Sequence, residues 1–204
     1  EIYNEFQISK NHKVITLMPG SRKSEIDRLA PVLFEVAEKL QKDNKNYQFI
    51  LPLAPGIEKD YIADMASKYN LILKIVRDSS YDIMKISDFL LTASGTATLE
   101  ALIMETPMIV LYETGWSTYK IGKKIMKTDY IAMPNIIAGT EVVPEFIQDE
   151  IDVKNIYDKT KFFLNKDYLL TDKKKKLKII KDKLGEKGAV KKTAELVLEV
   201  GGLN

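Results

Sequence analysis

Residues 88–112 have the sequence DFLLTASGTATLEALIMETPMIVLY, in which two apolar runs flank a short helical pattern. The first run, 88–93, ends at a small polar Ser-Gly-Thr turn, a helix is expected over 96–105, and the second run is 107–112. Neither run alternates apolar with polar residues, which is typical of parallel strands covered on both faces. Because parallel strands need a crossover connection, this stretch predicts a βαβ unit.

The same alternation of strand and helix extends along the chain. Further strands are expected over KVITLM (13–18), YQFILPL (47–53) and LILKIV (71–76). Periodic apolar residues predict helices after Ser21 and over 58–69, 79–86, 117–127, 142–149, 152–164, 170–184 and 189–200, with a short strand at 129–132. The pattern predicts one α/β domain over residues 1–204, a Rossmann-like parallel sheet with helices on both faces plus C-terminal helices.

The composition limits the classes of function. The 204 residues are 45% hydrophobic and include no cysteine, one histidine and a formal net charge of +2. No apolar stretch approaches the roughly 18 to 20 residues that span a bilayer, and nothing at the start resembles a signal peptide, so a soluble domain is expected. The single His12 cannot build a triad or a metal cluster, and the net charge is too small to indicate nucleic acid binding. Neither a GxGxxG fingerprint after a strand nor a P-loop is present.

Two glycine-containing turns follow strands of the expected sheet. PGSR (19–22) follows the strand 13–18, and SGT (94–96) follows the strand 88–93. In a parallel α/β sheet, ligands bind at the carboxyl ends of the strands, where loops meet helix N-termini. We therefore expect both turns at one edge of the sheet.

The SGT turn has the features of a phosphate site. A helix N-terminus presents unpaired backbone N–H groups and a partial positive charge. Gly95 lets the backbone approach an oxygen closely, and Ser94 and Thr96 add hydroxyl groups. Glu100 lies one turn deeper, where its carboxylate can accept from the hydroxyls of a ribose. The alternative is that Ser94 caps the helix and Glu100 is a solvated acid.

Arg22 begins the helix that follows the PGSR turn. Its guanidinium offers a planar fork of donors that suits phosphate oxygens. The alternative is a surface arginine paired with Glu25 or Asp27. Two small-residue turns at one sheet edge, one of them with an arginine, favour an anion site.

A third candidate is PNIIAG (134–139), in which a Pro-Asn pair signals a turn inside an apolar stretch. The amide of Asn135 either forms that turn or faces the crevice. Glu145 and Gln148 are expected on one face of the helix 142–149. The alternative is a capped surface helix.

Two further features leave alternatives open. Trp116 and Tyr119, with Ile121 and Ile125, belong either to the core, which we favour, or to a lipid-facing patch. Lysines dominate residues 154–192 and include four in succession. A solvated helix face is the favoured interpretation of this run, and contact with anionic lipid headgroups is the alternative.

Taken in order, these strings resemble lipid-A-disaccharide synthase, a glycosyltransferase family of the GT-B type. The resemblance rests on LMPGSRKSEI (17–26), SDFLLTASGTATLEALIMETPMIVLY (87–112), KTDYIAMPNIIAG (127–139) and VVPEFIQ (142–148). It covers about residues 13–165, and the strings SGTATLEA and PNIIAG are its specific parts.

The resemblance implies a fold and a reaction. Family members transfer 2,3-diacylglucosamine from its UDP conjugate to 2,3-diacylglucosamine 1-phosphate in lipid A biosynthesis, with inversion and without a metal or cofactor. Two Rossmann-like domains flank the active site, and the C-terminal one binds UDP. This chain is then expected to be that UDP-binding domain. The N-terminal acceptor domain, with the general base, is absent from it, so the isolated chain is expected to be inactive.

The resemblance also assigns residues. Arg22 is expected to contact the diphosphate or the sugar phosphate, and Glu100 the ribose. The diphosphate is further expected to contact Ser94, Gly95 and Thr96. Glu113 departs from the resemblance, which implies a basic residue there and leaves the role of the loop 113–118 open.

Three further residues are assigned by the same resemblance. Asn135 is expected in the crevice, with a supporting role in catalysis, and Glu145 and Gln148 are additional UDP-binding candidates.

Partners and location follow as expectations too. The partners are the UDP-2,3-diacylglucosamine donor and UDP, the missing domain and an anionic membrane surface, with no nucleic acid. The location is cytoplasmic, peripheral to the inner membrane of a Gram-negative bacterium. Self-association is expected through the last helix, whose Val190, Leu196, Val197 and Val200 need a partner. The alternatives are another UDP-sugar GT-B enzyme, such as a 2-epimerase, or a non-catalytic interaction domain.

Overall fold

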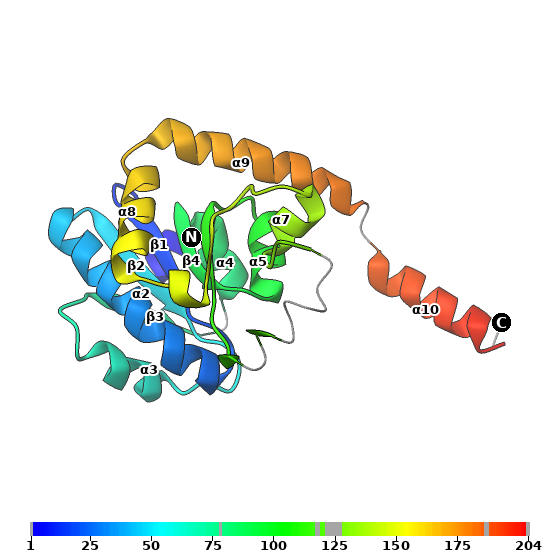
Figure 1. Cartoon of the computed structure of the whole chain (residues 1–204), viewed down its shortest axis with the longest axis horizontal. Helices are drawn as coiled ribbons and strands as arrows, with labels where there is room; N and C mark the ends of the chain where they lie inside the picture. Colours follow the sequence, from blue (N-terminus) through cyan, green and yellow to red (C-terminus); the bar gives the residue numbers. More distant parts are fainter. Residues whose placement is uncertain (1, 78, 117–118, 121–127, 186–187, 203–204) are drawn as a thin grey trace.

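The apolar runs form one six-stranded sheet in a computed structural model of the chain (Figure 1). The structure describes residues 2–77, 79–116, 119–120, 128–185 and 188–202. The strands are β1 (Lys13–Met18), β2 (Tyr47–Pro52), β3 (Leu73–Val76), β4 (Phe89–Ala93), β5 (Met108–Tyr112) and β6 (Glu145–Ile147). Their order is β3-β2-β1-β4-β5-β6, and all neighbours pair in parallel. The Rossmann-like sheet is confirmed, and the direction of strand order reverses between β1 and β4.

Most of the helices lie close to their expected positions. The helices are α1 (Ile2–Glu5), α2 (Lys23–Asp43), α3 (Lys59–Ala66), α4 (Ser80–Ile86), α5 (Thr96–Ile103), α7 (Met133–Ala138), α8 (Val153–Leu164), α9 (Asp167–Lys181) and α10 (Ala189–Val200). Of these, α1 and α7 were not predicted. Two 3-10 turns, η1 (Gln148–Glu150) and η2 (Asp182–Leu184), follow β6 and α9. The predicted helix at 170–184 therefore begins earlier, at Asp167, and ends in a 3-10 turn.

Both faces of the sheet are covered, as expected. On one face, Ile15 and Leu17 of β1 pack in a buried cluster with residues of α2, α3 and α8. On the other face, Leu90 of β4 and Val110 of β5 pack with residues of α5 and α9. Successive strand residues point to opposite faces, so two covered faces require an unbroken apolar run.

The stretch 142–149 is not the predicted helix. Val142 and Val143 are buried, and β6 pairs in parallel with β5 at the edge of the sheet. The few apolar residues of this stretch fit the period of a helix and that of a strand equally well. Pairing with β5 selects the strand. The spacing argument that put Glu145 and Gln148 on one helical face is therefore wrong.

Residues 129–132 do not form the predicted strand, and α7 begins directly after them, at Met133. Pro134 lies in the first turn of α7, where its missing N–H has no helical partner to lose. Gly139 ends the helix with a left-handed φ of 71°. The Pro-Asn pair thus starts a helix instead of forming a turn.

Trp116 does not belong to the core, contrary to the favoured interpretation. Its side chain is 53% exposed, and its ring meets that of Tyr119 edge-to-face with centroids 5.9 Å apart. Ile121 and Ile125, with most of the predicted helix 117–127, lie outside the described residues.

The last helix, α10, extends away from the sheet and its covering helices (Figure 1). None of its residues is buried. Its apolar side chains include Val190 and Val200, which are 86% and 88% exposed. In the described part of the chain, no helix combines the length and the apolar character needed to cross a membrane.

Candidate functional site

A cleft of about 540 Å³ lies at the carboxyl ends of β1 and β4, where the strand order reverses. Met18 and Thr92, which are register partners at the ends of these strands, form part of its wall. The turns that follow the two strands, with the first turns of the helices after them, supply most of its polar lining, which includes Gly20, Ser21, Arg22, Glu25, Ser94, Gly95, Thr96 and Glu100. The two turns therefore share one site, as their positions in the sequence indicate.

The SGT turn presents open backbone donors to this cleft. Gly95 is the N-cap of α5, and no side chain caps that helix. Within the described residues, the N–H groups of Gly95, Thr96 and Ala97 have no hydrogen-bond partner. Such groups, with the partial positive charge of the helix end, suit an anion.

Ser94 does not cap α5, so that alternative is not observed. Its hydroxyl donates to the Ile131 carbonyl at 3.3 Å, and its backbone N–H donates to the Leu111 carbonyl at 2.8 Å. The turn is thus attached on one side to β5 and on the other to the segment that enters α7.

Glu100 is half-buried at the edge of the cleft, one turn into α5. The hydroxyl of Tyr81, in α4, donates to its Oε1 at 3.0 Å. This hydrogen bond to the carboxylate raises the pKa of Tyr81. Sequence reasoning missed Tyr81, because its only signal is a tyrosine in the short helix before β4. The carboxylate keeps a second oxygen for a hydroxyl donor.

Arg22 lies at the N-cap of α2, and its side chain is 77% exposed. Its Nη1 forms an ion pair of 2.8 Å with Oε1 of Glu25, which is the alternative that the sequence left open. Both side chains nevertheless line the cleft. The pairing and the cleft position coexist, and Glu25 is a second residue of the site that sequence reasoning did not select.

Asn135, Glu145 and Gln148 are not among the residues that line the cleft. Asn135 is fully buried, and its Oδ1 accepts from the backbone N–H groups of Val142 and Val143 at 2.7 and 2.9 Å. Its Nδ2 donates to Glu145 at 2.7 Å and to the Val143 carbonyl at 2.8 Å. These contacts use the whole amide, so Asn135 supports the fold around the site.

Glu145 and Gln148 have similar structural partners. The Glu145 carboxylate accepts from the backbone N–H groups of Ile131 and Ala132. Gln148 accepts from the N–H of Thr114 at 2.7 Å and donates to its carbonyl at 3.0 Å. Glu145 therefore holds the segment whose carbonyl accepts from Ser94.

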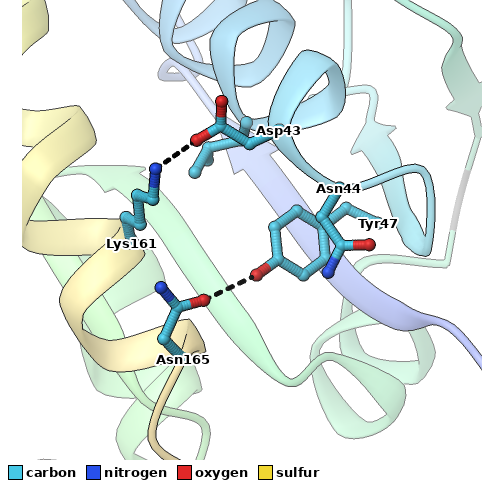
Figure 2. A pocket seen from close by; sticks show the side chains of 6 residues that line it. Asp43, Asn44, Tyr47, Lys161 and Asn165 are labelled. Carbon is cyan, nitrogen blue, oxygen red and sulfur yellow. Dashed lines mark hydrogen bonds and ion pairs between the residues drawn. The ribbon is translucent and has the colours of Figure 1, made fainter.

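A second pocket, of about 420 Å³, lies where β2 begins, away from the carboxyl ends of the strands (Figure 2). It is lined by Leu40, Asp43, Asn44, Tyr47, Lys161 and Asn165. Asp43 of α2 pairs with Lys161 of α8, and Tyr47 donates to Asn165 at 3.4 Å (Figure 2). Its charged groups, Asp43 and Lys161, are paired with each other and link α2 to α8. We call this ion pair the clamp between α2 and α8.

A family model described as Lipid-A-disaccharide synthetase matches residues 1–200. The chain belongs to the lipid-A-disaccharide synthase family. Among relatives, the lipid-A-disaccharide synthase of Geobacter sulfurreducens is 36% identical over 99% of this chain and 53% of its own length. That of Nitrosococcus oceani is 39% identical over 95% of this chain and 50% of its own length. The chain thus spans about half the length of the curated relatives it matches.

Solved structures support the fold assignment for this member of the family. WaaG, a glycosyltransferase involved in lipopolysaccharide biosynthesis, superposes with a TM-score of 0.59 at 16% identity, covering 89% of this chain and 45% of WaaG. A UDP-GlcNAc 2-epimerase from Neisseria meningitidis, bound to UDP-GlcNAc, superposes with a TM-score of 0.57 at 18% identity over 90% of this chain and 47% of the epimerase. The Rossmann-like half of a GT-B fold is confirmed.

Proposed function

We propose that this chain binds the UDP part of a nucleotide-sugar donor, as the donor-binding half of a lipid-A-disaccharide synthase. The observation that carries the proposal is the cleft between β1 and β4, which combines open N–H donors of α5 with the guanidinium of Arg22 and the carboxylate of Glu100. Family membership supports the class of reaction, a glycosyl transfer, and the sugar nucleotide is part of the proposal.

The diphosphate is assigned to the N-terminus of α5. There the N–H groups of Gly95 and Thr96 and the hydroxyl of Thr96 can donate to phosphate oxygens, with Ser94 in the same turn, and Arg22 supplies the opposite charge. The hydroxyls of the ribose are assigned to Glu100, whose carboxylate accepts from such donors.

The reaction proposed for the whole protein is the inverting transfer of 2,3-diacylglucosamine to 2,3-diacylglucosamine 1-phosphate. As the bond to UDP breaks, negative charge accumulates on the diphosphate. A helix N-terminus and an arginine stabilise that charge without a metal ion. The general base must approach from the opposite face of the sugar, and we assign it to the half of the relatives' length that this chain does not span. The isolated chain is therefore proposed to bind UDP without turnover.

Titration calorimetry with UDP tests the binding site. Arg22→Ala removes a charge-assisted contact, so UDP affinity should fall by about tenfold to a hundredfold. Glu100→Gln should weaken UDP by a smaller factor and leave inorganic diphosphate unaffected. Glu35→Gln, on the same helix as Arg22 and outside the cleft, is the control and should bind like the wild type. Unchanged UDP affinity in both cleft variants would refute the assignment.

We also propose that the exposed face of α9 contacts an anionic membrane at the cytoplasmic side. Lys174, Lys175 and Lys176 are exposed on this helix, as are Tyr168 and Ile179 at 66% and 64%. Lysines with interspersed apolar side chains suit a headgroup layer, at about 1 kcal/mol per basic residue. Cosedimentation with vesicles containing anionic lipid should fall on Lys174→Glu/Lys175→Glu substitution, and equal binding to neutral vesicles would contradict the proposal.

A further inference from the structure

The carboxylate of Glu25 accepts hydrogen bonds from several donors of the PGSR turn. Its Oε2 accepts from the backbone N–H groups of Ser21 and Arg22 at 3.0 and 3.3 Å. Its Oε1 accepts from Nη1 of Arg22 at 2.8 Å. Glu25 lies at the third position of α2 and accepts from the N-cap N–H, which is one half of a capping box; the other half is absent because a guanidinium cannot accept. The contact with the guanidinium goes beyond capping.

Gly20 allows the turn to close over this carboxylate. A Cβ at residue 20 would lie 2.6 Å from both Cβ and Oε2 of Glu25, which is too close for any side chain. The backbone of Gly20 also has a φ of 128°, a conformation that favours glycine. The turn and Glu25 therefore form one packed unit, and the carboxylate is part of how the turn is built.

The two helix N-termini that meet at the cleft differ as a result. The N–H groups of Ser21 and Arg22, which precede α2 and line the cleft, donate to Glu25, whereas those of Gly95, Thr96 and Ala97 at α5 have no partner in the described part of the chain. Among the residues that line the cleft, open backbone donors are thus found at α5, while those of Ser21 and Arg22 are occupied by Glu25. What the PGSR turn offers is the guanidinium of Arg22, which has five N–H donors, and Glu25 accepts from Nη1 alone.

We infer that Glu25 is a positioning residue that fixes one edge of the Arg22 guanidinium, so that its remaining donors face a diphosphate bound at the N-terminus of α5. This inference rests on the proposed UDP site. An arginine side chain that is 77% exposed loses considerable rotamer freedom when it grips a ligand. The ion pair with Glu25, whose side chain is only 27% exposed, restricts that freedom before the ligand arrives.

The test compares UDP and uridine binding to the whole chain and its Glu25→Gln variant. Glutamine keeps an acceptor for the capping box and removes the charge that holds the guanidinium. We expect about tenfold weaker UDP binding, the size of coupling seen between contacting residues, with unchanged uridine binding by ligand-observed NMR. Unchanged uridine binding also shows that the variant is folded. Glu35→Gln, which removes an equal charge from α2 outside the cleft, should change neither affinity.

A double-mutant cycle tests whether Glu25 affects UDP binding through Arg22. In the Arg22→Ala background, Glu25→Gln should have no further effect on UDP, because the side chain that it positions is gone. An equal loss in both backgrounds, or no loss in either, would overturn the inference. Tighter UDP binding by Glu25→Gln would show instead that the carboxylate competes with the diphosphate. If the wild-type chain fails to bind UDP, the proposed function itself is wrong. If the wild-type chain binds UDP and Glu25→Gln leaves the affinity unchanged, only the inference about Glu25 is wrong.

Discussion

Asn135 donates a hydrogen bond of 2.7 Å to Glu145, and this pair connects α7 to the edge strand β6. Glu145 also accepts from the N–H groups of Ile131 and Ala132, and the Ile131 carbonyl accepts from Ser94. The SGT turn is thus joined to a buried polar network that does not itself line the cleft. A residue of this network can affect the site without touching a ligand.

Asn135→Ala is therefore expected to destabilise the chain. It leaves the N–H groups of Val142 and Val143 without their acceptor and removes one of the donors to the Glu145 carboxylate, at a cost of about 2–4 kcal/mol in urea unfolding. Asn46→Ala, at an exposed asparagine, is the control and should cost less than about 0.5 kcal/mol. An Asn135→Ala variant that unfolds like the wild type would contradict this structural role.

The clamp between α2 and α8 predicts a pH dependence of stability (Figure 2). Hydrogen bonds from Lys161 and then Tyr157 lower the pKa of Asp43 below its usual 3.8. A carboxyl with a depressed folded-state pKa stabilises the fold above its unfolded pKa, and this contribution is lost as pH falls through the folded pKa. Asp43→Asn should thus reduce stability at pH 7 and make little difference in strong acid.

Unfolding of the two proteins followed between pH 7 and pH 2 measures this difference. Asp158→Asn, which removes an exposed partner of Lys154 elsewhere on α8, serves as the control. Parallel pH curves for Asp43→Asn and the wild type would contradict the role of the clamp.

Removal of α10 is expected to reduce self-association without changing the stability of the fold. Because none of its residues is buried, a chain ending at Gly185 should unfold within about 0.5 kcal/mol of the full chain. The exposed apolar side chains of α10 are expected to drive self-association, so light scattering should give a smaller mass for the shortened chain at high concentration. A monomeric full chain, or a marked loss of stability on truncation, would contradict this account of α10.

UDP binding is predicted to be independent of divalent metal. Among the described residues, no three His, Cys, Asp or Glu side chains are grouped to hold a metal ion, and the proposed counter-charges are the α5 N-terminus and Arg22. Calorimetry should return equal UDP affinities in EDTA and in magnesium. A tenfold gain with magnesium would show that the diphosphate needs a cation that the protein alone does not supply.

The sheet and the two turns could be predicted from sequence because strong local signals agree with the fold. The run FLLTA is buried throughout and apolar except for Thr92, since both faces of β4 are covered, and the SGT turn follows from its position after that strand. The edge strand β6 could not be predicted in this way. Its three residues, Glu145–Ile147, are too few to establish a period, and pairing with β5 determines their conformation.

The candidate site was predicted in part for a similar reason. Arg22 and Glu100 follow from their places at helix starts, but the partners of their side chains depend on elements that only the fold brings together. Tyr81 reaches Glu100 from another helix, and Asn135 is enclosed by β6 and the loop before it. A sequence pattern predicts on which helix or strand a polar residue lies. The packing around that residue determines whether its side chain faces a ligand or the backbone.

A crystal structure of this chain with UDP tests the central claim most directly. The account predicts the diphosphate within hydrogen-bond distance of the N–H groups of Gly95, Thr96 and Ala97, with Arg22 contacting it from the other side and Glu100 accepting from the ribose. UDP bound in the pocket between α2 and α8, or a diphosphate seated on the N–H groups of Ser21 and Arg22 with Glu25 displaced, would contradict it.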